Sequence, residues 1–517
     1  MNRKMISRAL LGGSALFWAT TALAQDPVPA DDTAVPDQSD ATADAAIAEA
    51  ASVDDAQAKI ELLQAQVEAL QEALEAVKTS MVKATPSWKG APEFADKDSG
   101  FSFKPKGFVQ FDAGLVGFPD GDELRGTVGG LNYQNLGFNA RARRLVFGAE
   151  GGLPGGFKYK AEFNLAQGLV DYEDILLSYD FAKSPLTVTV GNFYPYSSLE
   201  TVTSSRLGSM LERASFTDAF NYNRRLGIGL SLADKKADRY TLSAGVFSQP
   251  INDGSFTRTG WEVSARGTYT PPLAGGFLHL GASAHHRENN RESLGAQYRS
   301  RPLTQITDQR FVDTGTIAAK ADNSVGLELG GVFKAFHFAA EAQRMWLSHT
   351  YDAADLVGSA DDNDVAVGAR FNGDPSFSGG YFEAGYFLTG ESRGYKSGKW
   401  DRTKVLKPFD KEGWGAIQLN GRIDYLNLSD RVSSAPITAT ALQRVSAPYY
   451  VNGGKQLGYQ VSVIWNPMDY VRLLAQYGHV DVTGGPRAAT VDPTSTDSVN
   501  KRGYGVDTAA VRAQIEF

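Results

Sequence analysis

Apolar and polar residues alternate along most of the chain from about residue 105 to its end. In the segment 157–165, phenylalanine, tyrosine, alanine and leucine alternate with lysine, glutamate and asparagine. Successive side chains of a β-strand point to opposite faces, so this pattern predicts strands with one face suited to lipid and the other to water. About sixteen such segments occur, near 106–116, 141–150, 157–166, 172–182, 186–194, 225–234, 239–248, 260–270, 276–287, 324–334, 336–346, 379–389, 414–427, 457–466, 470–480 and 506–517.

The segments between these predicted strands differ in length. Short turns such as 155–156 and 466–469 alternate with long polar loops such as 288–322 and 390–413. Short turns at one end and long loops at the other are typical of outer-membrane barrels. The chain ends in an alternating segment with a terminal Phe517. Because an open sheet edge is not tolerated in lipid, the last strand should pair with the first. The pattern predicts an all-β transmembrane barrel of about 16 antiparallel strands.

The first residues have the pattern of an export signal. Three basic residues precede an apolar stretch, 9–19, that is too short to span a bilayer. Ala22 and Ala24 then form a small-x-small cleavage site. This predicts a signal peptide over 1–24 and a mature chain that starts at Gln25. An uncleaved anchor helix is the alternative, which the cleavage site disfavours.

A linker and a helix are predicted between the signal and the barrel. Residues 25–54 are rich in alanine, aspartate, proline and threonine, which indicates a disordered acidic linker. Over 55–82, apolar residues recur at alternating spacings of four and three, as in a coiled coil. A single helix of this length is marginal alone, so we expect copies of the chain to pair through it as a trimer. An amphipathic helix packed under the barrel is the alternative. The seam consists of Ala56, Ile60, Leu63, Val67, Leu70, Leu74 and Val77.

Composition and charge narrow the picture further. The chain has no cysteine and a mean hydropathy of -0.27. After the N-terminus it has no run of about 18 apolar residues that would form a membrane helix. The net charge is -8 in total, of which residues 1–24 carry +3 and residues 25–80 carry -11. The barrel region is therefore neutral, and any ion preference must come from where its charges lie.

The segment between the strands that end near 194 and start near 225 is too apolar for a free loop. We expect it to fold as a short helix against the inner barrel wall. It carries four arginines, and guanidinium groups can replace part of an anion's hydration shell. An arginine-lined constriction is one interpretation, and pairing of Arg213 with Glu212 or a wall carboxylate is the other. The four candidates are Arg206, Arg213, Arg224 and Arg225.

Basic residues on the polar faces of strands form a second candidate set for an anion path. They could focus a field across a wet pore, or form ordinary salt bridges with residues such as Glu162 and Asp424. They are Lys158, Lys160 and Arg422, with a further cluster of Arg141, Arg143 and Arg144 before or within the second strand.

Several short motifs resemble the phosphate-selective porin O/P family, and the resemblance covers about 105–517. It implies a sixteen-stranded barrel, a trimer, and a third loop that folds inward and lines an anion path with basic residues. Relatives often place lysine where this chain has Tyr194, and lysine is also frequent at the position of Arg206. The motifs are FKYKAEF at 157–163, VGNF at 190–193, SLE at 198–200, TSSR at 203–206 with MLER at 210–213, NRRLG at 223–227 and GYFLTGESR at 385–393.

Together these features predict a porin in the outer membrane of a Gram-negative bacterium. We expect a water-filled channel for passive diffusion of small anions such as phosphate, formed by a homotrimer in contact with outer-membrane lipid. Motifs of catalysis or metal binding are not evident in the sequence, so we expect no enzyme activity, cofactor, metal or nucleic-acid partner. The alternatives are a barrel that tethers the membrane to the cell wall, and an outer-membrane hydrolase.

Overall fold

The computed structural model divides the chain after residue 83 into two units, which are considered separately. In the first unit residues 57–72 are helical, within the predicted helix. The predicted signal peptide and linker lie outside the described residues, and the pairing of helices between copies stays a prediction. The described residues are 57–72, 75, 87–88, 90–96, 98–119, 136–168, 170–251, 260–288, 295–350, 374–430, 451–491 and 495–517.

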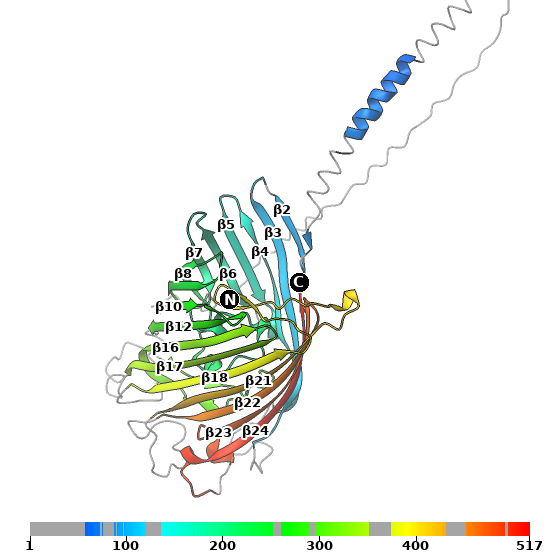
Figure 1. Ribbon diagram of the computed structural model, residues 1–517. Helices are drawn as coiled ribbons and strands as arrows, with labels where there is room; N and C mark the ends of the chain where they lie inside the picture. Colours follow the sequence, from blue (N-terminus) through cyan, green and yellow to red (C-terminus); the bar gives the residue numbers. More distant parts are fainter. Residues whose placement is uncertain are drawn as a thin grey trace, which may run out of the picture. The chain divides into compact units, whose positions relative to one another are not determined.

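The second unit is a closed antiparallel barrel of sixteen described strands. Each strand pairs with its neighbour in the sequence, and the last pairs with the first, with Ile515 opposite Val109 (Figure 1). Each of the sixteen predicted segments overlaps one strand, so the predicted fold is confirmed. The strands are β3 (Phe101–Val116), β4 (Gly137–Leu153), β5 (Phe157–Asn164), β6 (Asp171–Asp180), β7 (Leu186–Phe193), β8 (Arg225–Ala233), β9 (Tyr240–Phe247), β10 (Trp261–Tyr269), β12 (Gly276–Glu288), β16 (Ile317–Phe333), β17 (Phe336–Thr350), β18 (Ser376–Phe387), β21 (Ala416–Asp430), β22 (Val451–Met468), β23 (Val471–Thr483) and β24 (Gly503–Glu516).

The remaining elements are short. Two strands precede the barrel, and the others lie in its loops. They are β1 (Ser87–Trp88), β2 (Pro92–Asp96), β11 (Pro272–Leu273), β13 (Gly295–Ala296), β14 (Arg299–Ser300), β15 (Val312–Asp313), β19 (Gly394–Lys396) and β20 (Lys399–Asp401), with the helices η1 (Ala166–Gly168), α2 (Leu199–Val202), η2 (Ser205–Leu207), α3 (Ser215–Phe220), η3 (Phe409–Lys411), α4 (Ala488–Val491) and η5 (Val499–Lys501). Among the described residues, the helices are too short or too polar to cross a membrane.

The two faces of the barrel wall differ as the alternation predicts. On β8 the outward residues Leu226, Ile228 and Leu230 are between 41% and 58% exposed. On the inner face of β10, the charged residues Glu262 and Arg266 are buried. Apolar side chains in lipid and charges kept from it are the arrangement that a membrane barrel requires.

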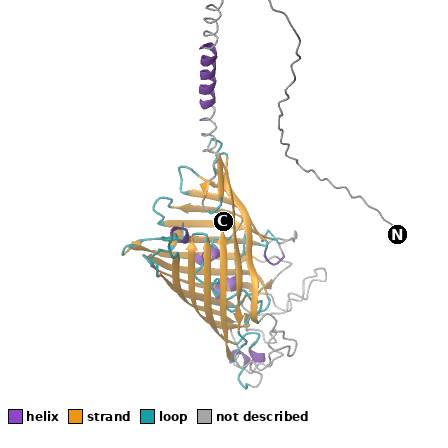
Figure 2. Cartoon of the chain, turned by 90° about the vertical axis from the view of Figure 1, so that its right-hand side faces the viewer, coloured by secondary structure: helices purple, strands orange, loops and turns teal. Residues whose placement is uncertain are grey.

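The segment 194–224, called L3 here, folds into the lumen as expected. It joins β7 to β8 and contains α2, η2 and α3. Its apolar anchors, including Leu211, Phe216 and Phe220, are at most 2% exposed. Phe216 stacks on Tyr381 of β18, and Phe220 packs edge-on against Tyr298. Figure 2 shows short helices within the ring of strands. Burial of these side chains holds L3 inside the barrel.

The loop 388–415 corrects one expectation about the barrel ends. We grouped 390–413 with the long loops opposite the short turns, but this loop joins β18 to β21. Because successive strands alternate in direction, it lies at the same end as the short turn 334–335. The hairpin of β19 and β20 reaches L3 from that end. There Trp400 donates its backbone N–H to the Thr203 hydroxyl at 3.3 Å, so two loops from opposite ends meet in the lumen.

Candidate functional site

Two cavities meet inside the barrel. The larger, of about 580 Å³, is lined by β4, β5, β6, L3 and the hairpin residues 399–401. The smaller, of about 180 Å³, is lined by L3, β4 and residues 300–305. Residues 300–305 belong to the loop between β12 and β16, at the barrel end opposite the loop 388–415. A solute that crosses the barrel by these cavities must pass between them. Among the described residues, the side chains that line both are Arg143, Arg144, Tyr194 and Arg213, called the arginine junction below.

A β-bulge points two consecutive arginines into the lumen. On β3, Gln110 pairs with Arg144 and the next residue, Phe111, pairs with Ala142. Arg143 is therefore an extra residue on β4. In an unbroken strand one of two successive side chains would face lipid, but a bulge allows both to point to the same side. Both guanidinium groups consequently line the cavities.

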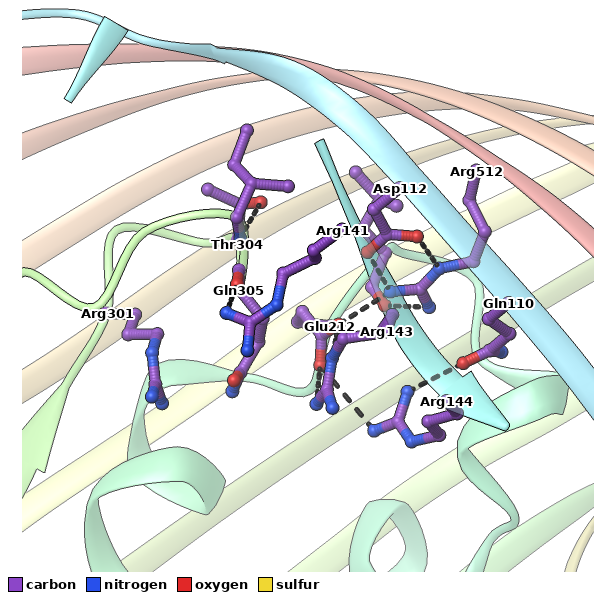
Figure 3. A network of polar contacts seen from close by, with 12 residues as sticks. Gln110, Asp112, Arg141, Arg143, Arg144, Glu212, Arg301, Thr304, Gln305 and Arg512 are labelled. Atoms are coloured by element: carbon purple, nitrogen blue, oxygen red, sulfur yellow. Dashed lines mark hydrogen bonds and ion pairs between the residues drawn. The ribbon is translucent and has the colours of Figure 1, made fainter. Parts of the chain in front are cut away.

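The carboxylate of Glu212 in L3 forms ion pairs with three arginines of the barrel wall (Figure 3). Glu212 accepts two hydrogen bonds from Arg143, at 2.8 and 2.9 Å. Arg512 of β24 lies 2.6 Å from the same carboxylate, and Arg144 lies 3.8 Å from it. Burial alone would raise the pKa of Glu212, but Arg143, Arg512 and Arg144 together lower it well below its usual value. Glu212 is therefore ionised and ties L3 to the wall.

Arg213 differs from its neighbours because its contacts are with neutral groups. It donates to the Tyr194 hydroxyl at 3.2 Å and to the backbone carbonyls of Thr201 and Thr203 at 3.0 and 3.2 Å. It forms no ion pair with any carboxylate in the part of the chain that the structure describes. Among the described residues, the positive charge of Arg213 is therefore not balanced by a direct ion pair.

The local sequence explains how L3 leaves the barrel wall at this point. Gly191 of β7 has a φ of +137°, and a Cβ there would lie 2.2 Å from the backbone oxygen of Ile175. Only glycine allows this approach of β6 and β7. The buried side chain of Asn192 then donates to the carbonyl of Glu173 at 2.7 Å. This fixes the end of the strand and places Tyr194 at the junction.

The larger cavity also carries charges of both signs. Lys160 pairs with Glu162 and Asp174, at 2.7 and 2.6 Å. Arg224 pairs with Glu173 and Asp174, the latter at 2.5 Å. Most of this wall is thus internally neutralised. Two further basic groups line this cavity. Arg206 of L3 lies 3.3 Å from Glu516, and Lys399 of the hairpin has no ion pair with the described residues.

Comparison with known proteins decides the family. A family model described as phosphate-selective porin O and P matches residues 121–504.

The chain belongs to this family. An uncharacterized protein of Caulobacter vibrioides is 34% identical over 461 residues, which cover 85% of this chain and 81% of the relative. Porin O of Pseudomonas aeruginosa is 27% identical over 419 residues, which cover 75% of this chain and 85% of that porin. The protein is thus a porin-family barrel of the outer membrane of a Gram-negative bacterium, and family and fold indicate a channel rather than an enzyme.

Solved outer-membrane structures also align with this porin. The channel DcaP of Acinetobacter baumannii has a TM-score of 0.43 and 12% identity, covering 82% of this chain and 99% of that one. An anion-selective porin from Comamonas acidovorans has a TM-score of 0.42 and 10% identity, covering 81% of this chain and all of that one.

The structure of the porin brings together only some of the residues that the sequence singled out. Of the L3 set, the arginines that line the larger cavity are Arg206, Arg213 and Arg224, and of the strand set Lys160 does so. These four keep their candidate role in the anion path.

The other three candidates lie elsewhere. Lys158 is at the short-turn end, where its exposed ammonium pairs with Asp180 at 2.6 Å. Arg225 pairs with Glu262 at 2.9 Å and does not line the two cavities. Arg422 is buried behind L3, between Glu200 and Glu383. Arg225 and Arg422 thus form buried ion pairs outside the two cavities.

The sequence did not fully identify three basic side chains that line the porin lumen. Arg143 and Arg144 were noted as a cluster, but nothing in the sequence announces the bulge that turns both inward. Lys399 was missed because its loop was placed at the wrong end of the barrel. The order of the predicted strands would have shown the correct end, since each strand reverses the chain direction.

Proposed function

We propose that the barrel is a passive channel for small anions and that the arginine junction is its selective point. The observation that carries this proposal is the excess of positive charge there: among the described residues, Arg143 and Arg144 form ion pairs with Glu212 alone, and Arg213 forms none. A sixteen-stranded barrel is wide enough for an aqueous channel, and loops narrow it to the cavities described above. Phosphate is a candidate solute, which the description of the family supports.

Replacing the three junction arginines by glutamine should abolish the anion preference. Two unit charges about 4 Å apart interact by roughly 4 kcal/mol at an effective dielectric of about 20, and by about 1 kcal/mol in bulk water. In a passage walled by protein the interaction energy should be closer to the first value. The loss of anion preference should therefore be large at low salt. The measurement is the reversal potential of single channels in a planar bilayer under a potassium chloride gradient, repeated with potassium phosphate.

The matched control removes three charges at the short-turn end instead. Lys158, Lys183 and Lys235 are exposed and lie outside both cavities, so changing them to glutamine should leave the reversal potential almost unchanged. Equal shifts in the two triple variants would show that bulk charge, and not the junction, sets the preference. A barrel with no conductance at all would favour the tether instead.

We also propose that the helix of 55–82 holds three copies of the porin together. In a single chain its apolar seam is uncovered, with Ile60, Val67 and Leu70 between 49% and 68% exposed. Packing against copies of itself would bury these side chains.

Changing Ile60, Val67 and Leu70 to aspartate should therefore lower the temperature at which the oligomer dissociates, because charges in the seam oppose packing. The readout is the heat-resistant oligomer on a gel, with Glu61→Asp as a control outside the seam. The barrel should still fold, since its strand pairing does not involve this helix. An unchanged dissociation temperature would refute a role of the seam in assembly.

A further inference from the structure

Tyr194 occupies a central position in the arginine junction. It directly follows β7, and its ring lies near two guanidinium groups, with the centroid 5.1 Å from Arg213 and 4.2 Å from Arg224. Its hydroxyl oxygen accepts a hydrogen bond from Arg213 at 3.2 Å. Contacts of this kind hold a cation in place without cancelling its charge, as long as the phenol is neutral.

The two arginines around Tyr194 differ in their charge balance. Arg224 pairs with Glu173 and Asp174, so its charge is already compensated. The hydrogen bonds of Arg213 end on the phenol and on two backbone carbonyls. The protonation state of Tyr194 therefore decides whether Arg213 faces a neutral partner or an anion.

We propose that Tyr194 is a positioning residue that keeps the charge of Arg213 available to permeating anions, and that ionisation of its hydroxyl withdraws this charge at alkaline pH. The inference rests on the proposed anion channel. A phenolate beside Arg213 forms an ion pair in which the guanidinium is neutralised within the protein. The anion preference then falls without any change of the barrel.

The surroundings favour this ionisation. Burial alone would raise the pKa of Tyr194, but the charges of Arg213 and Arg224 lower it below its ordinary value of 10, against a smaller opposing effect of Glu173. The preference is thus present below this pKa and lost as the pH rises through it.

Several other titratable groups face the same space. Carboxylate and guanidinium groups generally keep their charge between neutral and alkaline pH, whereas the ammonium groups of lysine can lose their protons in alkaline solution. The test must therefore separate the phenol of Tyr194 from the lysines and from Tyr172. Besides Arg213 and Arg224, the groups are Arg143, Arg144, Lys160, Glu162, Asp171, Tyr172, Glu173, Asp174, Arg206, Glu212, Asp218, Arg301, Lys399 and Asp401.

The experiment compares the pH profile of the reversal potential in a potassium chloride gradient, from about pH 7 to about pH 10.5, for the full-length channel and Tyr194→Phe. Phenylalanine keeps the ring beside both arginines and removes the hydroxyl. We expect the parent to lose anion preference over this range and the variant to retain most of its neutral-pH value. An equal alkaline loss in both would overturn the inference and assign the loss to the other titratable groups of the cavities, Lys160, Lys399 and Tyr172.

Two further variants make the result specific. Tyr196→Phe carries the same change two residues on, outside both cavities, where burial raises the pKa of the tyrosine to about 12. It should keep the alkaline loss of the parent. Arg213→Gln should lack that loss, because Tyr194 acts through Arg213. If Arg213→Gln kept the full alkaline loss, the inference would again be overturned, even if Tyr194→Phe failed to fold.

The outcome also separates this inference from the function on which it rests. A parent channel without anion preference at neutral pH would contradict the proposed function. A parent with that preference, and with an alkaline loss that survives in both Tyr194→Phe and Arg213→Gln, would contradict only the role of Tyr194.

Discussion

An Arg422→Met variant is expected to lose about 3–5 kcal/mol of unfolding free energy, because the change leaves two buried carboxylates without their cation. Arg422 lies 2.8 Å from Glu200 and 2.6 Å from Glu383, and its side chain is 3% exposed. Replacing one member of such a buried group is costly because the remaining charges have no water to solvate them.

The same change should loosen L3. The Glu200 carboxylate that Arg422 holds also accepts hydrogen bonds from the Ala214 backbone and the Thr217 hydroxyl, at 2.8 and 2.7 Å. Glu200 therefore connects the wall to two parts of L3, and its anchor is Arg422. We expect single channels of the variant to show a larger and noisier conductance, since the loop no longer keeps one position in the lumen.

The stability loss is measured by urea unfolding in lipid vesicles, followed by tryptophan fluorescence. Lys158→Met is the matched control, because its pair with Asp180 is at an exposed position where such pairs contribute about 0–1 kcal/mol. If both variants unfolded alike and conducted alike, Arg422 would not be anchoring L3.

Glu212→Gln is the second change with a large expected effect, and it should strengthen the anion preference. The glutamine keeps the shape of the side chain but removes the one carboxylate, among the described residues, that forms ion pairs with Arg143 and Arg144. The loss of one unit charge at about 4 Å changes the local energy of an ion by about 1–4 kcal/mol, depending on how much water the passage holds. At 1 M salt the effect should shrink, because the Debye length falls to about 3 Å.

The pH dependence of this effect provides a stringent check. Because the arginines hold the pKa of Glu212 well below 4.5, the parent keeps the carboxylate ionised at about pH 4. Parent and variant should therefore still differ there in reversal potential, whereas an ordinary glutamate would be largely protonated and the two would converge. Asp401→Asn, in the larger cavity but outside the junction, should give a smaller shift. Convergence near pH 4 would argue against the charge network around Glu212.

The fold could be read from the sequence because one physical rule governs every strand. Alternation between lipid and water located all sixteen strands, and the apolar anchors Phe216 and Phe220 marked L3 as a loop that folds inward. The partners of individual charges could not be found in this way. Arg422 pairs with Glu200, more than two hundred residues earlier in the chain, and no local pattern links the two.

The arginine junction, too, could not be predicted from local sequence patterns. Strict alternation predicts that Arg143 and Arg144 lie on opposite faces, and the shift of register that unites them depends on how β3 and β4 pair. No local pattern separates Arg213 of L3, with its neutral contacts, from Arg225 at the start of β8, which binds Glu262. Only the tertiary contacts distinguish a charge that faces the solute from one that supports the wall.

The bulge in β4 also raises the charge density that a pore of fixed width can hold. In a regular strand, side chains on one face recur about every 6.8 Å, because each residue advances the chain by about 3.4 Å. That spacing limits how steeply the potential can change along a permeation path. One extra residue places Arg143 and Arg144 about one residue apart on the same face. The barrel thereby gains a short, steep step in potential without an added strand, a wider ring or a charge in lipid.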